Sequence, residues 1–247
     1  MRKLIAVSAA VGLAAASFAV APVAGASTSA AAAKAASVSW GACSDPGLQA
    51  AGAVCGYLSV PLDYSKPSGA KIKLAVSMVR HTSPESKYQG IMITNPGGPG
   101  GSGLTLSTLG SYVPGTSAST YDWIGFDPRG VGSSIPALTC DPNFFQGPRL
   151  QYVPTSPAIV QQWLAISKAY ALACGKDQPA LLQHVKTIDS VKDMDQIRIA
   201  LGQKQINYYG FSYGTYLGSL YAQQYPDRVR ALLLDGAIDP AVPVDEV

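Results

Sequence analysis

The chain has 247 residues, of which 47% are hydrophobic and 13% charged, and its formal net charge is +3. This composition is typical of a chain that buries a sizeable core, and it argues against global disorder. Arg2 and Lys3 lie in a segment that we expect to be removed. Without them, 16 basic residues face 15 acidic ones, a net charge of +1. So balanced a charge gives no basis for binding nucleic acid or an anionic membrane.

The first 26 residues predict a signal peptide. A basic start at residues 1–3 precedes an apolar, alanine-rich stretch at residues 4–23, and residues 24–26 have the small-x-small pattern that signal peptidase cuts. We therefore expect secretion with cleavage after Ala26, and no stable membrane anchor. The alternative is a retained transmembrane anchor, because the apolar stretch approaches the length that spans a bilayer. Its small alanine side chains give it weak membrane affinity.

The order of apolar segments after residue 37 predicts an α/β fold. Residues 27–37 are an Ala/Ser-rich spacer, and the packed domain is expected to occupy residues 38–247. Strand patterns at residues 57–62 and 72–79 flank a turn, so an antiparallel hairpin should open the sheet. Continuous apolar runs then alternate with helical patterns, which is typical of a mostly parallel sheet covered on both faces. The runs are 91–94, 123–126, 206–209 and 231–234, and the helical patterns are 157–173, 190–201 and 214–224.

Four cysteines agree with export, because disulfides persist outside the cytosol. Three pairings are possible, and short loop closure favours Cys43–Cys55 together with Cys140–Cys174. A metal site is the alternative. The chain has no Cys-x-x-Cys pair, and neither of its two histidines lies near a cysteine. We therefore predict two structural disulfides and no metal.

A Gly-x-Ser-x-Gly motif at residues 210–214 has Ser212 at its centre. The motif alone is weakly specific, but here it lies between a predicted strand and a predicted helix. That strand–turn–helix setting presents a serine hydroxyl above the sheet. The flanking glycines let strand and helix pack closely. Ser212 is therefore the predicted nucleophile.

A glycine-rich loop at residues 95–103 follows the run 91–94. Acyl transfer needs backbone N–H donors directed at the developing oxyanion. We expect these donors to be Gly98, or alternatively Gly97, together with Tyr213, the residue after the nucleophile. A phosphate-binding loop would carry a lysine, which is absent here, and a purely structural turn remains an alternative.

Asp127-Pro128-Arg129-Gly130 follows the next apolar run. Asp127 is an acid near the expected catalytic edge, but it precedes Ser212, whereas the catalytic acid of this arrangement follows the nucleophile. We expect the turn to pair its own charges and to order the neighbouring loop.

Taken together, these three motifs resemble those of the secreted tripeptidyl aminopeptidases, in the proline iminopeptidase group of α/β-hydrolases. Residues 55–64 and 234–240 are similar to that family too, so the resemblance runs from about residue 40 to the last residue. It implies an α/β-hydrolase fold and a serine exopeptidase that releases tripeptides or short residues from peptides with a free N-terminus. Pro96 stands where proline iminopeptidases usually carry histidine, which favours the tripeptidyl branch. No cofactor is implied, since an activated serine requires none.

The base and the acid that would activate Ser212 are not found. His81 and His184 both precede it and are predicted to be packing or surface residues. Asp235 and Asp239 follow the run 231–234, whereas in the resembled family the acid lies past an inserted cap and the histidine later still. We therefore expect the N-terminal part of an α/β-hydrolase, truncated before the cap and the last strands, inactive, and with an unpaired sheet edge.

Two other functions stay open. One is a secreted esterase or lipase on the same scaffold, and the other is a non-catalytic truncated product. The composition does not predict an oligomeric state.

Overall fold

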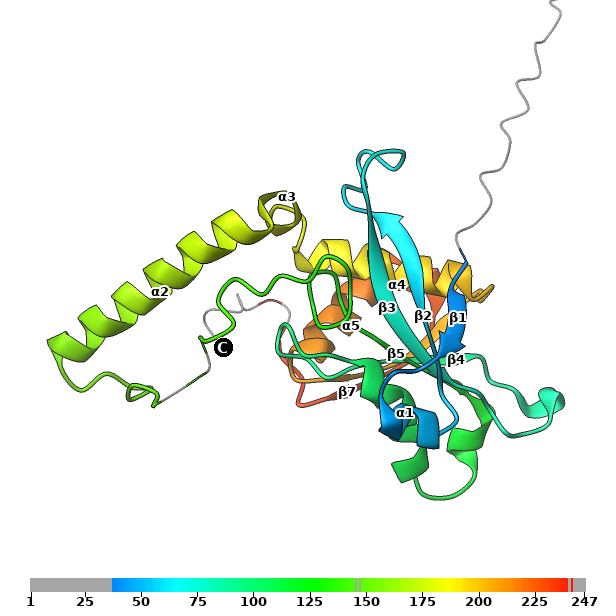
Figure 1. Cartoon of the computed structure of the whole chain (residues 1–247). Helices are drawn as coiled ribbons and strands as arrows, with labels where there is room; N and C mark the ends of the chain where they lie inside the picture. The colour runs from blue at the N-terminus through cyan, green and yellow to red at the C-terminus, as the bar shows by residue number, and fades with distance from the viewer. Residues whose placement is uncertain (1–36, 145, 147, 240, 242–247) are drawn as a thin grey trace, which may run out of the picture. The chain divides into compact units, whose positions relative to one another are not determined.

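The structure is a computed structural model that describes residues 37–144, 146, 148–239 and 241 (Figure 1). The predicted signal peptide and nearly all of the predicted spacer lie outside these residues. Within the described part of the chain, no helix combines the length and the apolarity needed to cross a membrane.

A seven-stranded mixed sheet organises the described residues, with the strand order β1-β2-β3-β5-β4-β6-β7. The pairs β1–β2, β2–β3 and β3–β5 are antiparallel. The pairs β4–β5, β4–β6 and β6–β7 are parallel. The predicted antiparallel start and parallel remainder are confirmed. The strands are β1 (Ser39–Ala42), β2 (Val54–Pro61), β3 (Lys71–Val79), β4 (Ile91–Asn95), β5 (Asp122–Phe126), β6 (Ile206–Phe211) and β7 (Val229–Asp235).

The predicted helices are all present, with boundaries shifted by a few residues. Two of the helices begin where a capping side chain precedes a proline: Asp45 before Pro46, and Ser156 before Pro157. The α-helices are α1 (Pro46–Ala50), α2 (Pro157–Asp177), α3 (Pro179–Leu182), α4 (Thr187–Ala200) and α5 (Tyr213–Gln224). The 3₁₀ helices are η1 (Glu85–Lys87), η2 (Leu104–Tyr112), η3 (Ser117–Thr120) and η4 (Pro226–Arg228).

The two faces of the sheet are covered differently. Ile124 and Phe126 of β5 belong to the core cluster that α4 and α5 complete. Trp123 and Gly125 of β5 point to the opposite face. A Cβ at Gly125 would lie 2.4 Å from the carbonyl oxygen of Gly103, just before η2, and the Trp123 indole donates to the Ala118 carbonyl of η3. That face is therefore covered by 3₁₀ turns, where α-helices were expected. The segment between β4 and β5, which contains η2 and η3, is rich in glycine, and glycine disfavours α-helix.

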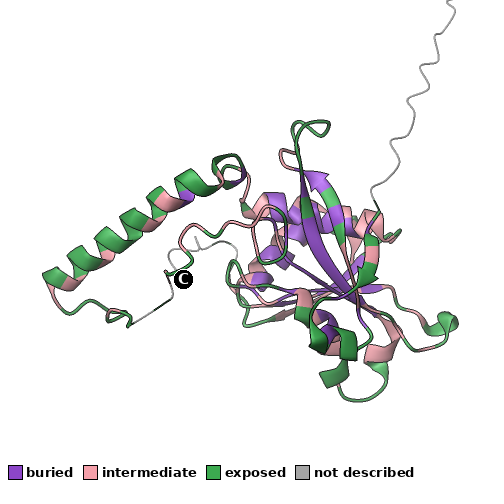
Figure 2. Cartoon of the chain, in the orientation of Figure 1, coloured by how far each residue is buried: buried purple, intermediate pink, exposed green. Residues whose placement is uncertain are grey.

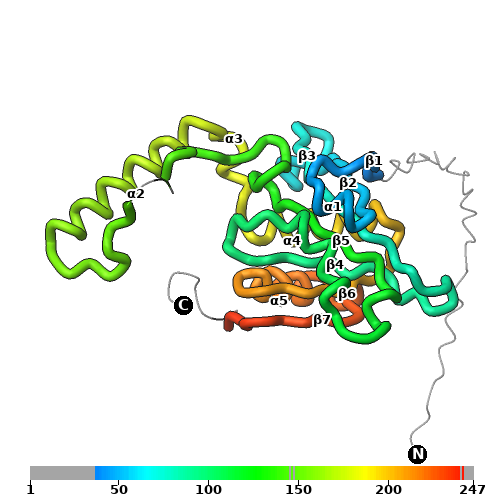
Figure 3. The backbone as a smooth tube through the Cα atoms, turned by 60° about the horizontal axis from the view of Figure 1, so that its bottom comes forward, coloured from blue at the N-terminus to red at the C-terminus, as the bar shows by residue number. Residues whose placement is uncertain are grey.

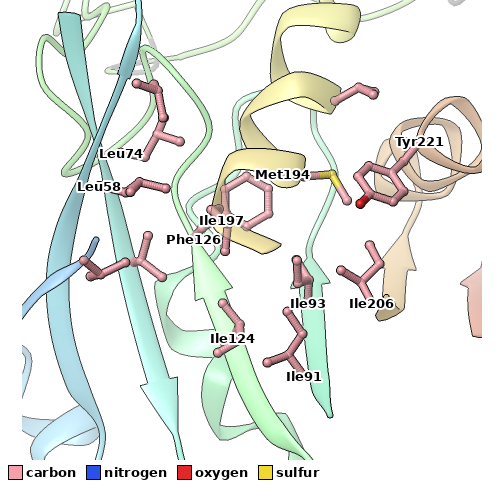
Figure 4. Packing of buried hydrophobic residues seen from close by; sticks show 14 of the residues in the cluster. Leu58, Leu74, Ile91, Ile93, Ile124, Phe126, Met194, Ile197, Ile206 and Tyr221 are labelled. Carbon is pink, nitrogen blue, oxygen red and sulfur yellow. The ribbon is translucent and has the colours of Figure 1, made fainter. Parts of the chain in front are cut away.

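The main core lies between the sheet and α4 (Figure 4). Met194 and Ile197 of α4 lie close to Phe126 of β5 and Ile93 of β4, and Tyr221 of α5 lies next to Met194. All five are fully buried. Burying a side chain of this size stabilises the fold by roughly 1.5–3 kcal/mol. The hydrophobic face of α4 therefore anchors β4 and β5 at the centre of the sheet.

Both predicted disulfides are present, Cys43–Cys55 and Cys140–Cys174. The first ties the segment before α1 to β2. The second ties the end of α2 to the segment after β5, and α2 is exposed along most of its length (Figure 2). Two crosslinks thus hold the two peripheral helices that contribute least to the core.

β7 forms one edge of the sheet and lies beside α5 (Figure 3). Among the described residues its outer edge has no strand partner, and Leu233 at its centre is 49% exposed. The predicted unpaired edge is confirmed for this part of the chain.

Gly218 of α5 provides a test of the packing between α5 and β6. A Cβ at this position would lie 2.5 Å from a ring carbon of Tyr208, whose hydroxyl donates to the Gly214 carbonyl at 2.7 Å, so the buried ring has no room to move. We expect Gly218→Ala to lower the free energy of unfolding by about 1–3 kcal/mol, measured by urea denaturation.

Gly175→Ala is the matched control, since Gly175 is also helical and its added Cβ meets no atom within 4 Å. It should be neutral, or stabilising by up to about 1 kcal/mol. Equal effects of the two substitutions would contradict the packing described for α5.

Candidate active site

Ser212 stands at the turn between β6 and α5. Its backbone has φ 51° and ψ −125°, a conformation that costs a non-glycine residue free energy. Its N–H donates to the Asp235 carbonyl at 3.0 Å, and its carbonyl accepts from the Thr215 N–H at 2.8 Å and hydroxyl at 2.6 Å. Ser212 is nevertheless exposed. Neighbouring segments thus hold a strained serine at the surface, in the predicted strand–turn–helix setting.

The two glycines of the motif are required by close backbone approach. A Cβ at Gly210 would lie 2.5 Å from the Gly214 carbonyl oxygen, and a Cβ at Gly214 would lie 2.7 Å from that of Asn95. The close packing predicted at the two flanking glycines is confirmed. The contact between Gly214 and Asn95 also shows that the end of β4 packs against the motif.

The glycine-rich loop lies directly against this turn. Gly97 has φ +88°, and its added Cβ would lie 2.4 Å from the Phe211 carbonyl and 2.9 Å from the Tyr213 nitrogen. Its own N–H donates to the Asn95 side chain at 2.9 Å. Gly97 is therefore a packing residue whose amide is already engaged, which leaves Gly98 and Tyr213 as the candidate oxyanion donors.

The N-terminus of α5, like those of α3 and α4 and unlike those of α1 and α2, has no side-chain cap. The side chain of Ser212, its N-cap residue, makes no capping hydrogen bond, whereas Asp45 and Ser156 cap their helices. A helix start without a side-chain cap leaves backbone N–H groups and a partial positive charge for a ligand. An oxyanion formed next to Tyr213, the first residue of α5, fits that arrangement.

Asp127 joins the two loops at this edge of the sheet. Its buried carboxylate accepts from the Ser102 hydroxyl at 2.6 Å, the Gly103 N–H at 3.0 Å and the Ser133 N–H at 2.7 Å. The prediction that Asp127 orders the loop is confirmed. The prediction that it pairs with Arg129 is wrong.

Arg129 instead forms a buried ion pair with Asp193 of α4. Its Nε and Nη2 donate to the two carboxylate oxygens at 2.7 Å each, and Tyr64 donates to the same carboxylate at 2.7 Å. The remaining guanidinium protons reach the carbonyls of Leu62 and His184 at 2.9 Å, and that of Pro61 at 3.2 Å. This cluster ties β2, the loop after β5 and α4 together. No sequence motif marks Asp193, whereas Tyr64 is the last residue of the segment 55–64 that resembles the family.

A second contact missed from the sequence holds the side chain of Tyr213. Its hydroxyl lies 2.6 Å from the hydroxyl of Thr187, the first residue of α4. Burial raises the pKa of Tyr213, so the phenol stays neutral. α4 thereby positions the residue whose N–H is a candidate oxyanion donor.

The two histidines do not reach the nucleophile. The Nδ1 of His81 lies 2.7 Å from Asp122, at the amino end of β5, whereas Ser212 follows the carboxyl end of β6. β5 and β6 run parallel, each paired with β4, so these are opposite edges of the sheet. His184 contributes its backbone carbonyl to Arg129, and no hydrogen bond in the described part of the chain joins either histidine to Ser212.

The two downstream aspartates have other partners. Asp235 accepts the Ser212 N–H through its backbone, and its carboxylate accepts from the Tyr209 hydroxyl at 3.2 Å. Asp239 accepts the N–H of Ala241 at 2.9 Å. The described residues therefore place the predicted nucleophile beside the candidate oxyanion donors, and none of them is placed to act as its base.

Comparison with known proteins agrees with this geometry. The family described as alpha/beta hydrolase fold matches residues 90–247. Tripeptidyl aminopeptidase of Streptomyces coelicolor is 44% identical over 191 residues, 76% of this chain and 35% of that protein. Serine protease Hip1 of Mycobacterium tuberculosis is 40% identical over 197 residues, 76% of this chain and 36% of that protein. The chain thus spans about a third of the length of these relatives.

Two further similarities are broader. Carboxylesterase B of M. tuberculosis is 38% identical over 198 residues, covering 78% of this chain and 38% of that protein. The solved proline iminopeptidase of Mycobacterium smegmatis aligns with a TM-score of 0.41 at 16% identity, over 71% of this chain and 42% of that chain. With a TM-score this low, the alignment carries no argument about the site or its function.

Removing the carboxylate of Asp193 tests the buried ion pair. Asp193→Ala leaves Arg129 charged and buried without its counterion, so we expect the free energy of unfolding to fall by about 3–5 kcal/mol. Urea denaturation measures this. Asp63→Ala serves as control, because among residues 37–239 the hydrogen bonds of its carboxylate go to the neighbouring Ser65. A loss no larger than that of the control would contradict the structural role of the pair.

His81 gives the fold a pH dependence. Its hydrogen bond to Asp122, with further attraction from Glu85, raises the pKa of His81 above its ordinary value of 6.5. A group with a raised folded-state pKa stabilises the fold below pH 6.5 and loses that contribution as pH rises through the raised value. Urea unfolding across that range should therefore show stability falling more steeply in the wild type than in His81→Asn. If the free energy of unfolding depended on pH equally in the two proteins, the raised pKa of His81 would be contradicted.

Proposed function

Since this chain belongs to the α/β-hydrolase family, we propose that it carries the nucleophile of a secreted serine exopeptidase that releases tripeptides or short residues from free peptide N-termini. The supporting observation is the strained, exposed Ser212, held beside the glycine-rich loop and the uncapped start of α5. The four disulfide-bonded cysteines support export, and cleavage after Ala26 is part of the proposal.

The proposed chemistry follows from that arrangement. The Ser212 hydroxyl attacks the carbonyl carbon of the scissile peptide, and its proton passes to a base that is not among the described residues. The amides of Gly98 and Tyr213 stabilise the oxyanion of the tetrahedral intermediate, an interaction that strengthens only as charge develops. Collapse of the intermediate expels the new amino terminus, which takes the proton from that base, and leaves an acyl-enzyme. Water hydrolyses the acyl-enzyme, which releases the N-terminal peptide and restores the Ser212 hydroxyl.

The same nucleophile and oxyanion donors would act on esters, so the esterase alternative remains a second candidate. The similarity to a protein named carboxylesterase favours it, at a lower identity than the similarity to tripeptidyl aminopeptidases. A hydroxyl without a base is a poor nucleophile, so the 247-residue chain alone is expected to hydrolyse neither class.

A chimera tests the proposal. Residues 38–241 of this chain would be joined to the part of the S. coelicolor tripeptidyl aminopeptidase that this chain does not match. We expect the chimera to release tripeptides from chromogenic peptide anilides with a free N-terminus, and to leave N-acetylated ones intact. Ser212→Ala should lower kcat by at least about a thousandfold, because the nucleophile is lost.

The isolated 247-residue chain and its Ser212→Ala variant are the controls, and both should be inactive. Turnover of acyl esters alone by the chimera would favour the esterase, and a folded chimera inactive on both classes would favour a non-catalytic product. Hydrolysis by the isolated chain that depends on Ser212 would contradict the need for an additional base.

A further inference from the structure

A cavity of about 300 Å³ lies at the edge of the sheet opposite to Ser212. Ile91 and Asp122, the first residues of β4 and β5, line it, whereas Ser212 follows the carboxyl end of β6. β4 pairs parallel with both β5 and β6, so the two sites are at opposite ends of these strands. The volume is at the lower end of the range for small-molecule sites. The cavity is therefore separate from the candidate active site and suits a compact ligand.

The polar wall of the cavity is fixed by its own hydrogen bonds. The Asp122 carboxylate accepts from the His81 backbone N–H at 2.8 Å and from the Tyr88 hydroxyl at 3.0 Å, and it lies 2.7 Å from the His81 Nδ1. The rings of His81 and Tyr88 lie against each other, with centroids 4.4 Å apart. The Ser83 N–H donates to the Ser119 carbonyl at 3.1 Å, which ties this segment to η3. A preformed wall lowers the ordering cost of binding.

The apolar part of the lining belongs to the core of the protein. Met78 of β3 and Ile91 of β4 are 3% and 1% exposed, and Leu201, just after α4, lines the cavity beside them. Side chains packed this closely do not move to fill the cavity. They provide a fixed surface on which a small apolar group loses contact with water.

Two side chains of the lining have hydrogen-bond donors without an acceptor. Within the described residues, no hydrogen bond or ion pair joins the Arg80 guanidinium to another group, and the Trp40 indole N–H has no acceptor. The other two indoles, of Trp123 and Trp163, each donate to a backbone carbonyl at 2.9 Å. Arg80 is exposed and Trp40 is partly buried. Both therefore offer donors to a ligand that carries an acceptor.

The charges of the lining select the kind of acceptor. His81 stands between two carboxylates, with Asp122 at its Nδ1 and Glu85 3.3 Å from its Nε2, whereas Arg80 has no counterion among the described residues. A planar guanidinium matches the geometry of a carboxylate. The two acidic side chains repel a dianion such as phosphate more strongly than a monoanion. A single carboxylate is the group that fits these charges.

We propose that this cavity binds a small organic monocarboxylate, whose carboxylate accepts from Arg80 and Trp40 and whose apolar body packs on Met78 and Ile91. The inference goes beyond the proposed function and does not depend on it, because the cavity and Ser212 lie at opposite edges of the sheet.

Titration of the full 247-residue chain with phenylacetate, followed by proton–nitrogen correlation NMR, tests the proposal. The chain has three tryptophans, and Trp40→Phe identifies the Trp40 indole signal by its loss. We expect phenylacetate to shift that signal saturably and to leave the indole signals of Trp123 and Trp163 in place. Phenylacetamide, which has the same shape without the charge, should bind at least about fivefold more weakly.

Arg80→Gln removes the guanidinium from an exposed position, so the fold should be retained. It should weaken phenylacetate binding about fivefold, the upper end of the range for an exposed ion pair. Arg149→Gln is the matched control, since it makes the same substitution at an exposed arginine outside the lining. It should leave the affinity for phenylacetate unchanged.

Three results would overturn the proposal: no saturable shift of the Trp40 signal, equal affinities for phenylacetate and phenylacetamide, or equal effects of Arg80→Gln and Arg149→Gln. Binding of inorganic phosphate as tight as that of phenylacetate would also overturn it, because the apolar body would then contribute nothing. The assay requires no turnover, so its result is independent of the peptidase activity.

Discussion

The backbone of the glycine-rich loop touches the backbone of the turn that carries Ser212, the predicted nucleophile, and the proposed active site depends on that contact. Gly97 lies against Phe211 and Tyr213, and Gly214 lies against Asn95. Because no side chain stands between these segments, the amide of Tyr213 and the loop that contains Gly98 lie side by side above the sheet. An oxyanion site made of two backbone segments requires this closeness, since amide groups cannot reach across a gap as side chains can.

Buried polar groups hold the segments that make this contact. Asp127 binds the end of the glycine-rich loop and the loop after β5, and Arg129 binds Asp193 together with three carbonyls. Each charge is desolvated, so each is tolerable only with its hydrogen bonds complete. Among the described residues, neither Asp127 nor Arg129 has a hydrogen bond to Ser212. Their effect is to give two irregular loops one defined position.

The two ends of the parallel strands have different chemistry. At the carboxyl ends, the exposed Ser212 stands beside the backbone amides of the glycine-rich loop and of α5. At the amino ends, His81, Asp122 and Tyr88 bind one another. A histidine and an aspartate 2.7 Å apart resemble part of a catalytic triad in composition, but their position at the opposite edge gives them a stabilising role.

The sequence by itself determined the α/β class, the antiparallel start, both disulfides, and the strand–turn–helix setting of Ser212. These features follow from local periodicity, glycine spacing and short loop closure, which a single sequence carries directly. Only the tertiary structure decided that Arg129 pairs with Asp193 and that Gly97 has no free amide, and it alone placed Thr187 against Tyr213. Each of these contacts joins segments that are distant in the chain or depends on which of several acceptors lies nearest in space. Ordering such contacts requires the packed sheet, because residue type and spacing do not distinguish Asp127 from Asp193 as the partner of a buried arginine.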